Sequence, residues 1–466
     1  MSKVNLKTAA YVSTATLILL VRLIRLDADP PPWLSWSSGI YSDEGIYASD
    51  ARSLALFGCW APGDFHSAII APLHHLLLLG VFKVFGVSLL TVRAFDVVCS
   101  LVSLIFFTLA LRRQFDDRSA FTGLIFLGLS PIYVFYNRLG LMETPTVLLL
   151  TAALYASTFE EGTIAEGFLL ALAVIYKPLA LLCVPAFFVD LKQHPKQAAA
   201  RLSVLVAGIA AYALIWQAPH RTALAKANRY YLLHQYLPHS TAGIVHDLIR
   251  SLFIGEADGV IPYLLHTAPV LICLAAIALF QQSAKDTRTL RFLCWFAVPA
   301  TAFCFISYAP SRYFVLFLPG LAGAAAISVN QLDMIWRRTI VSAFVALSLL
   351  TIALSLQSAT YEIERGGKLL RTTLPAGTTI VGQYAPELAL SNCFRAMYVQ
   401  PKLANSVGFL GSGMILITRS PFWDNYWSDR EDGKLTPTPQ FSLSLPKSQS
   451  VDFYPAPASG ESSSRL

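Results

Sequence analysis

Two adjacent carboxylates stand in segment 41–52, shortly after the first long apolar run of the chain. Asp43 and Glu44 begin a stretch in which Asp43 and Tyr47 share one helical face, because side chains four residues apart are neighbours on a helix. Adjacent carboxylates just outside a membrane span suit a general base or a cation site. The alternative is a solvated acidic helix start, with Asp43 as the N-cap and Glu44 in the first turn.

A lysine interrupts another apolar stretch, at residues 167–190. Lys177 precedes Pro178, which cannot continue a helix without losing a hydrogen bond. An ionisable group near membrane depth is costly and therefore indicates function. The alternative is a lysine at a kink whose long side chain reaches the interface.

The composition shows what kind of protein holds these residues. The chain has 466 residues, of which 55% are hydrophobic and only 14% are charged, whereas a soluble domain has about 25% charged residues. This excludes an ordinary soluble enzyme, and the apolar content excludes a disordered chain. The net charge of +7 comes from short basic clusters between apolar runs, which indicates membrane topology and no nucleic-acid partner.

Because about 20 apolar residues cross a bilayer as a helix, the apolar runs predict the spans. Apart from 167–190, these runs are 9–26, 93–111, 119–137, 144–158, 202–218, 262–281, 292–308, 313–330 and 339–357.

Basic loops predict the orientation. The positive-inside rule places four basic loops on the cytoplasmic face with the N-terminus, namely 112–118, 192–201, 282–291 and 331–338. With these loops on one face, the number of crossings between them must be even. This requires 167–190 to cross twice, as a short helical pair broken at Lys177, and 67–86 to remain interfacial or re-entrant. The prediction is an all-α protein of about eleven spans with the C-terminus outside. Arg22 and Arg25, at the outer end of the first span, count against this orientation and are expected to snorkel.

The chain divides into a transmembrane domain and an outer C-terminal region. Residues 1–357 hold the spans and two large outer loops, 27–92 and 219–261. Residues 358–441 are richer in Gly, Pro, Ser and charge, and segment 378–382 has the pattern of a strand after a turn, which predicts a small α/β domain outside the membrane. The Ser- and Pro-rich residues 442–466 are expected to be disordered.

Several motifs follow one another in an order that is more specific than any one of them. They are Asp43-Glu44 followed by Tyr47, Pro72-Leu73, Gly86 with Arg93, and Arg138 with Glu143. This order resembles the GT-C superfamily of polyprenyl-phosphate-sugar-dependent glycosyltransferases. Within it, the chain is most similar to the branch that contains protein O-mannosyltransferases and lipid A aminoarabinose transferases. The resemblance covers roughly residues 9–330.

The resemblance implies a reaction on the outer side of the membrane. A sugar on a polyprenyl phosphate would pass to a hydroxyl acceptor with inversion, while the lipid phosphate leaves. Asp43 matches the catalytic acidic position of the family and is the expected base, and Glu44 would orient Asp43 or the acceptor. A partly desolvated carboxylate near other acids is suited to accept a proton.

The leaving phosphate needs cations, and the resemblance implies where they are. Arg138 lies in the second outer loop of the family, where a guanidinium can hold a phosphate; the alternative is a snorkelling arginine. Glu143 is expected to hold Arg138 or sugar hydroxyls, or to be a structural partner. Lys177 is a further candidate. Arg312 and Tyr313 resemble the late basic and tyrosine site for lipid phosphate; the alternative is an aromatic belt.

Metal dependence stays open at this point. Most of the nine histidines lie in or beside outer segments, and His66 is expected to contact the donor or the acceptor. Some relatives have an acidic residue and a lysine just before Pro-Leu. This chain has Ile69 and Ile70 at those two positions, so part of a divalent metal shell is missing. Cys59 and Cys393 lie outside the predicted spans, and whether they pair is open.

The prediction is therefore a glycosyltransferase in a bacterial inner membrane, with a lipid-linked sugar donor and a lipid, glycan or protein acceptor. A transporter or flippase of a lipid-linked anionic sugar is the alternative from another class, because spans bearing basic residues can also line a path. No internal repeat supports that alternative. An oligosaccharyltransferase is the nearest alternative among enzymes.

Overall fold

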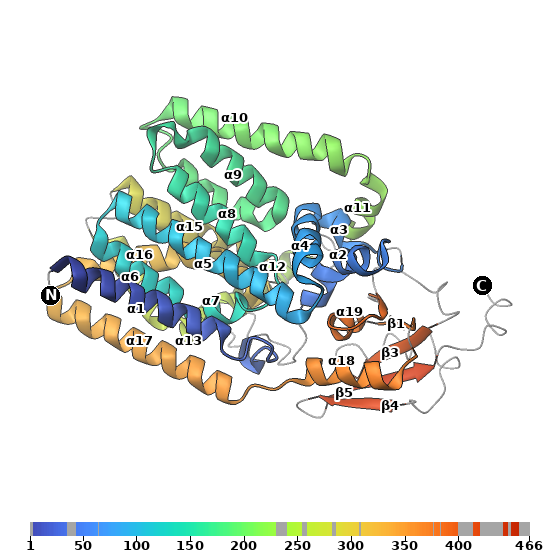
Figure 1. Cartoon of the computed structure of the whole chain (residues 1–466). Helices are drawn as coiled ribbons and strands as arrows, with labels where there is room; N and C mark the ends of the chain where they lie inside the picture. Colours follow the sequence, from blue (N-terminus) through green and yellow to red (C-terminus); the bar gives the residue numbers. More distant parts are fainter. Residues whose placement is uncertain are drawn as a thin grey trace.

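A computed structural model describes residues 3–34, 43–63, 65–229, 240–253, 259–281, 286–306, 309–375, 377–382, 384–398, 413–419, 441–445 and 449–455. Most of these residues form a helical body, and an α/β unit lies against one end of it (Figure 1).

The helical body consists of helices that follow one another from α10 through α9, α8 and α5 to α1 and α17 across the view of Figure 1. Its helices are α1 (Lys3–Leu23), α5 (Leu89–Gln114), α6 (Asp117–Gly128), α7 (Pro131–Tyr136), α8 (Glu143–Ala156), α9 (Thr163–Tyr176), α10 (Pro195–Tyr212), α13 (Val260–Thr267), α14 (Pro269–Phe280), α15 (Thr287–Phe303), α16 (Leu318–Asn330) and α17 (Met334–Gln357). Short helical segments are η1 (Pro32–Leu34), η2 (Glu160–Gly162), η3 (Pro178–Phe188), η4 (Ala213–Gln217) and η7 (Ser311–Leu316).

Helix α16 lies at the centre of the body, and residues 318–329 are all buried. Its glycines allow close packing, because a Cβ added at Gly320 would lie 2.7 Å from the backbone nitrogen of Phe296 in α15. Small residues at helix contacts let backbones approach closely, which is how helices gain contact inside a membrane.

Prolines divide several of the apolar runs into shorter helices. Pro131, Pro178 and Pro269 each stand at the first position of a helical segment, where a missing N–H is tolerated. Among the described residues, three helices are long and apolar enough to cross a membrane, or four if the pair Val260–Thr267 and Pro269–Phe280, bent by 111°, counts as one span. The total of eleven spans stays a prediction, whereas the break at Lys177 is confirmed by the end of α9 at Tyr176.

Arg22 does not reach the interface, so the snorkelling expected for it is wrong. Its side chain is fully buried. Its Nε donates to Ser100 Oγ at 2.9 Å and its Nη1 to the carbonyls of Ile18 at 3.0 Å and Gly128 at 2.9 Å. A guanidinium can donate hydrogen bonds to several acceptors at once. Backbone carbonyls inside the helical body therefore accept the hydrogen bonds that water would accept at the membrane interface.

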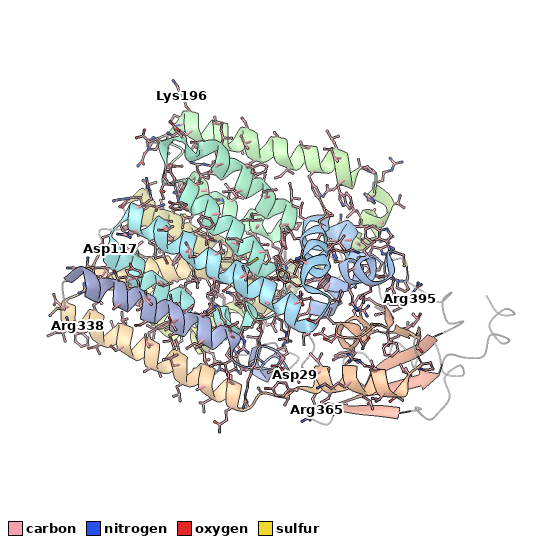
Figure 2. All side chains as sticks on the ribbon, in the orientation of Figure 1. Asp29, Asp117, Lys196, Arg338, Arg365 and Arg395 are labelled. Atoms are coloured by element: carbon pink, nitrogen blue, oxygen red, sulfur yellow. The ribbon has the colours of Figure 1, made fainter. Side chains whose placement is uncertain are left out.

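The two ends of the body differ. Figure 2 shows Asp117, Lys196 and Arg338 at the end away from the α/β unit, and Asp29, Arg365 and Arg395 near that unit. The N-terminal ends of α10 and α17, which contain Lys196 and Arg338, therefore lie at the same end of the body. At the other end lie α2 (Glu44–Phe57), α3 (Ser67–Ile70), α4 (Pro72–Phe85) and α11 (Arg221–Asn228), while α12 (Thr241–Phe253) lies nearer the middle of the view.

The C-terminal unit combines two helices with a five-stranded sheet. Its elements are α18 (Glu362–Thr373), β1 (Thr379–Val381), α19 (Ala385–Ala389), β2 (Arg395–Met397), β3 (Gly413–Arg419), β4 (Phe441–Leu445) and β5 (Gln449–Pro455). The strand order is β2-β1-β3-β5-β4. β1 pairs in parallel with β2 and β3, with Ile380 opposite Ala396 and Met414, whereas β5 pairs antiparallel with β3 and β4. Strand β1 confirms the strand predicted at 378–382.

The last two strands fall in the segment for which disorder was expected from Ser442 onward. Residues 441–445 read Phe-Ser-Leu-Ser-Leu, which alternates apolar and polar side chains with the period of a strand. Composition suggested disorder, but this alternation together with pairing to β5 produces a strand.

Candidate active site

Asp43 lies at the N-cap position of α2, but its side chain makes no capping hydrogen bond. Instead, its Oδ2 lies 2.6 Å from Arg312 Nη2 and accepts a hydrogen bond from the Tyr47 hydroxyl at 3.1 Å. Tyr47 can donate because it stays protonated: burial, followed by the nearby Asp43 carboxylate, raises its pKa well above the ordinary value. Asp43 therefore faces other functional groups and does not serve as a solvated helix cap.

Glu143 is a second carboxylate, and two cationic side chains contact it. Glu143 is the first residue of α8, and its Oε1 lies 2.5 Å from Lys177 Nζ and 3.4 Å from Arg312 Nε. Its Oε2 is buried and has no hydrogen-bond partner among the described residues. Lys177 reaches Glu143 because α9 ends at Tyr176 and the backbone of Lys177 is extended, which turns its side chain away from the direction that a continued helix would give it.

Aromatic rings line this group of charges. Lys177 Nζ lies 4.6 Å from the ring centre of Tyr313 and 5.8 Å from that of Tyr47. The guanidinium carbon of Arg312 lies 5.2 Å from the Tyr313 ring. A cation within about 6 Å of an aromatic ring is attracted by its π face, so the two tyrosines help to hold the cations in place.

These residues form the acid–base cluster, which consists of Asp43, Tyr47, Glu143, Lys177, Arg312 and Tyr313. The side chains of Asp43 and Arg312 are 16% and 18% exposed, whereas those of Glu143 and Lys177 are 1% and 4% exposed. The cluster is therefore accessible at Asp43 and Arg312 and closed behind them. A base beside two cations is an arrangement that can accept a proton and bind an anionic leaving group.

Glu44 does not join the acid–base cluster. It is fully buried and pairs with Arg93 of α5, whose Nε and Nη2 lie 2.9 and 2.7 Å from its two oxygens. Glu44 also accepts the backbone N–H of Gly140 at 2.7 Å, and Arg93 donates to the carbonyls of Leu26 and Ala28. This pair joins α2 to α5 and to the segments after α1 and α7.

We expect Glu44→Gln to destabilise the protein, because removing one partner of a buried ion pair costs about 3–5 kcal/mol. Thermal unfolding in detergent, followed by the loss of monodisperse protein, checks this. Glu364→Gln, at the exposed pair with Lys368, is the matched control and should unfold like the wild type. Glu44→Gln protein of unchanged stability but reduced turnover would instead support the catalytic role implied by the resemblance.

Arg138 also lies outside the acid–base cluster. Its Nη2 donates to the backbone carbonyls of Ile24, at 2.6 Å, and Arg25, so it satisfies carbonyls just beyond α1. Burial, with the charges of Arg93 and Arg22 nearby, lowers its pKa to about 10, and it remains a cation at neutral pH. Its Nη1 has no hydrogen-bond partner among the described residues.

His66 binds a different carboxylate from those in the acid–base cluster. Its Nδ1 lies 3.1 Å from Asp50 Oδ1, and Asp50 also accepts the backbone N–H of Ala68 at 2.9 Å. Burial raises the pKa of Asp50, but the His66 hydrogen bond and the other favourable contacts outweigh it, so this pKa is lowered overall. The pair fastens α2 to the start of α3.

The described residues contain no group of three His, Cys, Asp or Glu side chains placed to hold a metal ion. In the acid–base cluster, both carboxylates already face Lys177 or Arg312, and fixed positive charges disfavour a further cation. The donor set therefore does not fit a divalent metal in this arrangement. Cys59 and Cys393 are both free and exposed.

The structure thus brings together five predicted site residues: Asp43, Glu143, Lys177, Arg312 and Tyr313. Tyr47 has no role that its residue type alone predicts, and its place on the helical face of Asp43 is the local signal that connects it to the site. The pairing of Arg93 with Glu44 has no local signature in the sequence, because the two residues are 49 positions apart.

Comparisons with known proteins give one family model and several similar structures. A family model described as dolichyl-phosphate-mannose-protein mannosyltransferase matches residues 70–222, a segment that includes Glu143 and Lys177. A search of curated protein sequences returns no match. The structure of ArnT from Cupriavidus metallidurans bound to undecaprenyl phosphate is similar, with a TM-score of 0.64 at 12% identity, covering 96% of this chain and 97% of that chain.

Two further structures are similar to this chain. ArnT from Cupriavidus metallidurans in the apo state has a TM-score of 0.65 at 13% identity, covering 96% of this chain and 98% of that chain. The archaeal oligosaccharyltransferase AglB from Archaeoglobus fulgidus, in complex with an inhibitory peptide and a dolichol-phosphate, has a TM-score of 0.53 at 11% identity, covering 84% and 64%. At these identities, the likeness concerns the fold.

Proposed function

We propose that the chain is a GT-C membrane glycosyltransferase that moves a sugar from a polyprenyl-phosphate carrier to an acceptor hydroxyl on the extracytoplasmic side, which the family model over residues 70–222 and the fold shared with ArnT support. The observation that carries the proposal is the position of Asp43, which is partly exposed and lies directly beside Arg312, with Lys177 behind it. Asp43 is suited to take a proton, and Arg312 and Lys177 are suited to hold a phosphate.

In the proposed reaction, Asp43 accepts the proton of the acceptor hydroxyl as the oxygen attacks the anomeric carbon. The bond between that carbon and the lipid phosphate oxygen breaks, and the phosphate leaves with the electron pair, so the sugar is transferred with inversion. Charge develops on the leaving phosphate, and fixed cations stabilise such charge most where water is excluded.

Arg312 lies beside the proposed base and is also one of the two cations proposed to bind the leaving phosphate. Its Nη2 lies 2.6 Å from Asp43 Oδ2, and its Nε lies 3.4 Å from Glu143 Oε1. A donor phosphate bound at Arg312 and Lys177 would compete with Asp43 for the guanidinium and free the Asp43 carboxylate to face the acceptor hydroxyl. Glu143, whose Oε2 has no hydrogen-bond partner among the residues that the structure describes, is proposed to accept hydrogen bonds from the sugar.

The other predicted residues have supporting roles in this reaction. Glu44 and Arg138 hold the segments around the acid–base cluster through buried contacts, and His66 fastens the start of α3 to α2. We place the protein in a bacterial inner membrane, with the N-terminus cytoplasmic and the C-terminal unit outside. A divalent metal has no role in the proposed steps.

Transfer of radiolabel from a panel of polyprenyl-phosphate sugars in proteoliposomes tests the proposal. We expect label to move from one donor to a lipid, glycan or peptide acceptor, and protein-free liposomes give the background. The same vesicles report whether labelled lipid crosses the bilayer. Lipid crossing without transfer from any donor would overturn the proposal in favour of a flippase.

A further inference from the structure

The C-terminal unit touches the helix that begins next to Asp43. Gly45 of α2 lies against the backbone of α19, so that a Cβ added there would lie 2.3 Å from the nitrogen of Glu387 and 2.5 Å from the carbonyl carbon of Pro386. A backbone cannot move aside as the end of a side chain can. The two helices therefore approach as closely as they do only because residue 45 is glycine.

A second contact holds α2 further along its length. Nη2 of Arg52 donates to the carbonyls of Asn392 at 2.7 Å and Phe394 at 2.6 Å, in the turn between α19 and β2. Arg52 is buried, and burial lowers its pKa to about 10, so it is still a cation at neutral pH. A hydrogen bond from a charged donor is stronger than one from a neutral donor.

The faces of α2 have different partners. Gly45 and Arg52, seven residues apart, lie on the face that meets the C-terminal unit, and Ala48 packs in the same apolar core as Leu388 of that unit. Asp43 and Tyr47 turn instead towards Arg312 and Lys177. Because a helix is a rigid rod over this length, the contact on one face fixes where the other face places its side chains.

The C-terminal unit is also fastened to the helical body independently of α2. Asp29, which follows α1, accepts hydrogen bonds from Thr360 Oγ1 at 2.7 Å and from the backbone N–H of Glu362 at 2.6 Å, at the start of α18. Figure 2 shows Asp29 near this end of α18. The Ser391 hydroxyl accepts the backbone N–H of Leu89, the first residue of α5, at 3.1 Å.

We infer that the C-terminal unit positions the catalytic end of α2: it rests on the helical body at Asp29 and Leu89, and holds Asp43 in place through its contacts with Gly45 and Arg52. Gly45 and Arg52 are positioning residues, since neither touches the acid–base cluster. This inference rests on the proposed function in naming Asp43 as the base, whereas the mechanical coupling between the unit and α2 does not depend on it.

Gly45→Ala tests the inference, with Gly80→Ala as the matched control. Gly80 lies in α4 with nothing within 4 Å of an added Cβ, so its variant should match the wild type. For Gly45→Ala we expect kcat per mole of folded, monodisperse enzyme to fall about 10²-fold, the size of loss that a small misplacement of a catalytic group produces. KM for the donor should change little, because Lys177 and Arg312 lie on other elements.

Hydrogen exchange provides a readout that does not depend on activity. Backbone amides at the start of α2 should exchange faster in Gly45→Ala than in Gly80→Ala. Arg52→Ala should do the same, and Arg52→Lys, which keeps a charged donor, should restore part of the protection and part of kcat.

The outcomes separate the inference from the proposed function. Wild-type enzyme without transfer from any donor would overturn the proposed function, while faster exchange in Gly45→Ala and Arg52→Ala would still support the coupling. Unchanged exchange and unchanged kcat in folded Gly45→Ala would overturn the inference. Reduced yield of folded Gly45→Ala with normal kcat and normal exchange in the folded fraction would also overturn it, because that result describes a stability role alone.

Discussion

Asp43→Asn is expected to lower the rate of sugar transfer by about 10²- to 10⁴-fold, the range over which general base catalysis contributes. The asparagine keeps the size of the side chain and can still accept a hydrogen bond from Tyr47, but it cannot take the proton of the acceptor hydroxyl. Single-turnover transfer of labelled sugar from saturating donor measures this loss without interference from product release.

The fold should survive the Asp43→Asn substitution. The carboxylate is partly exposed and its partner Arg312 keeps Glu143 within 3.4 Å, so the guanidinium is not left without a counter-charge. Glu364→Gln serves as the control, since it makes the same class of change at an exposed pair in the C-terminal unit. Transfer at the wild-type rate by folded Asp43→Asn would move catalysis away from this residue.

Lys177→Met is expected to affect both stability and activity. Lys177 Nζ lies 2.5 Å from Glu143 Oε1, and both side chains are almost completely buried. Removing the cation leaves the Glu143 carboxylate with Arg312 alone, and breaking a buried pair costs about 3–5 kcal/mol of unfolding free energy. Losing one fixed cation at the leaving phosphate should also lower kcat by about 10²- to 10³-fold.

A double variant separates these two effects. Lys177→Met combined with Glu143→Gln removes the unpaired carboxylate, so thermal unfolding should return towards the wild-type temperature. Transfer should stay low, because the cation is still absent. If the double variant regained both stability and turnover, Lys177 would be a structural partner of Glu143 and would have no part in holding the donor phosphate.

Local patterns in the chain were enough to predict the helical membrane body, the helix end at Lys177 and the strand near 379–381. Each depends on neighbours in sequence: apolar runs, a proline that cannot continue a helix and an apolar strand after a turn. Composition alone was misleading for residues 442–445, because serines that alternate with apolar residues are compatible with disorder and also with a strand that has one polar face. Pairing with β5 decides between these two states.

Only the tertiary structure decided which charges meet. Asp43 and Glu44 are adjacent, but successive side chains on a helix point about 100° apart. Asp43 therefore faces Arg312 and Glu44 faces Arg93. Residue types and motif order identified both carboxylates as candidates, whereas their separation into a partly exposed site and a buried structural pair depended on helices that are remote in sequence.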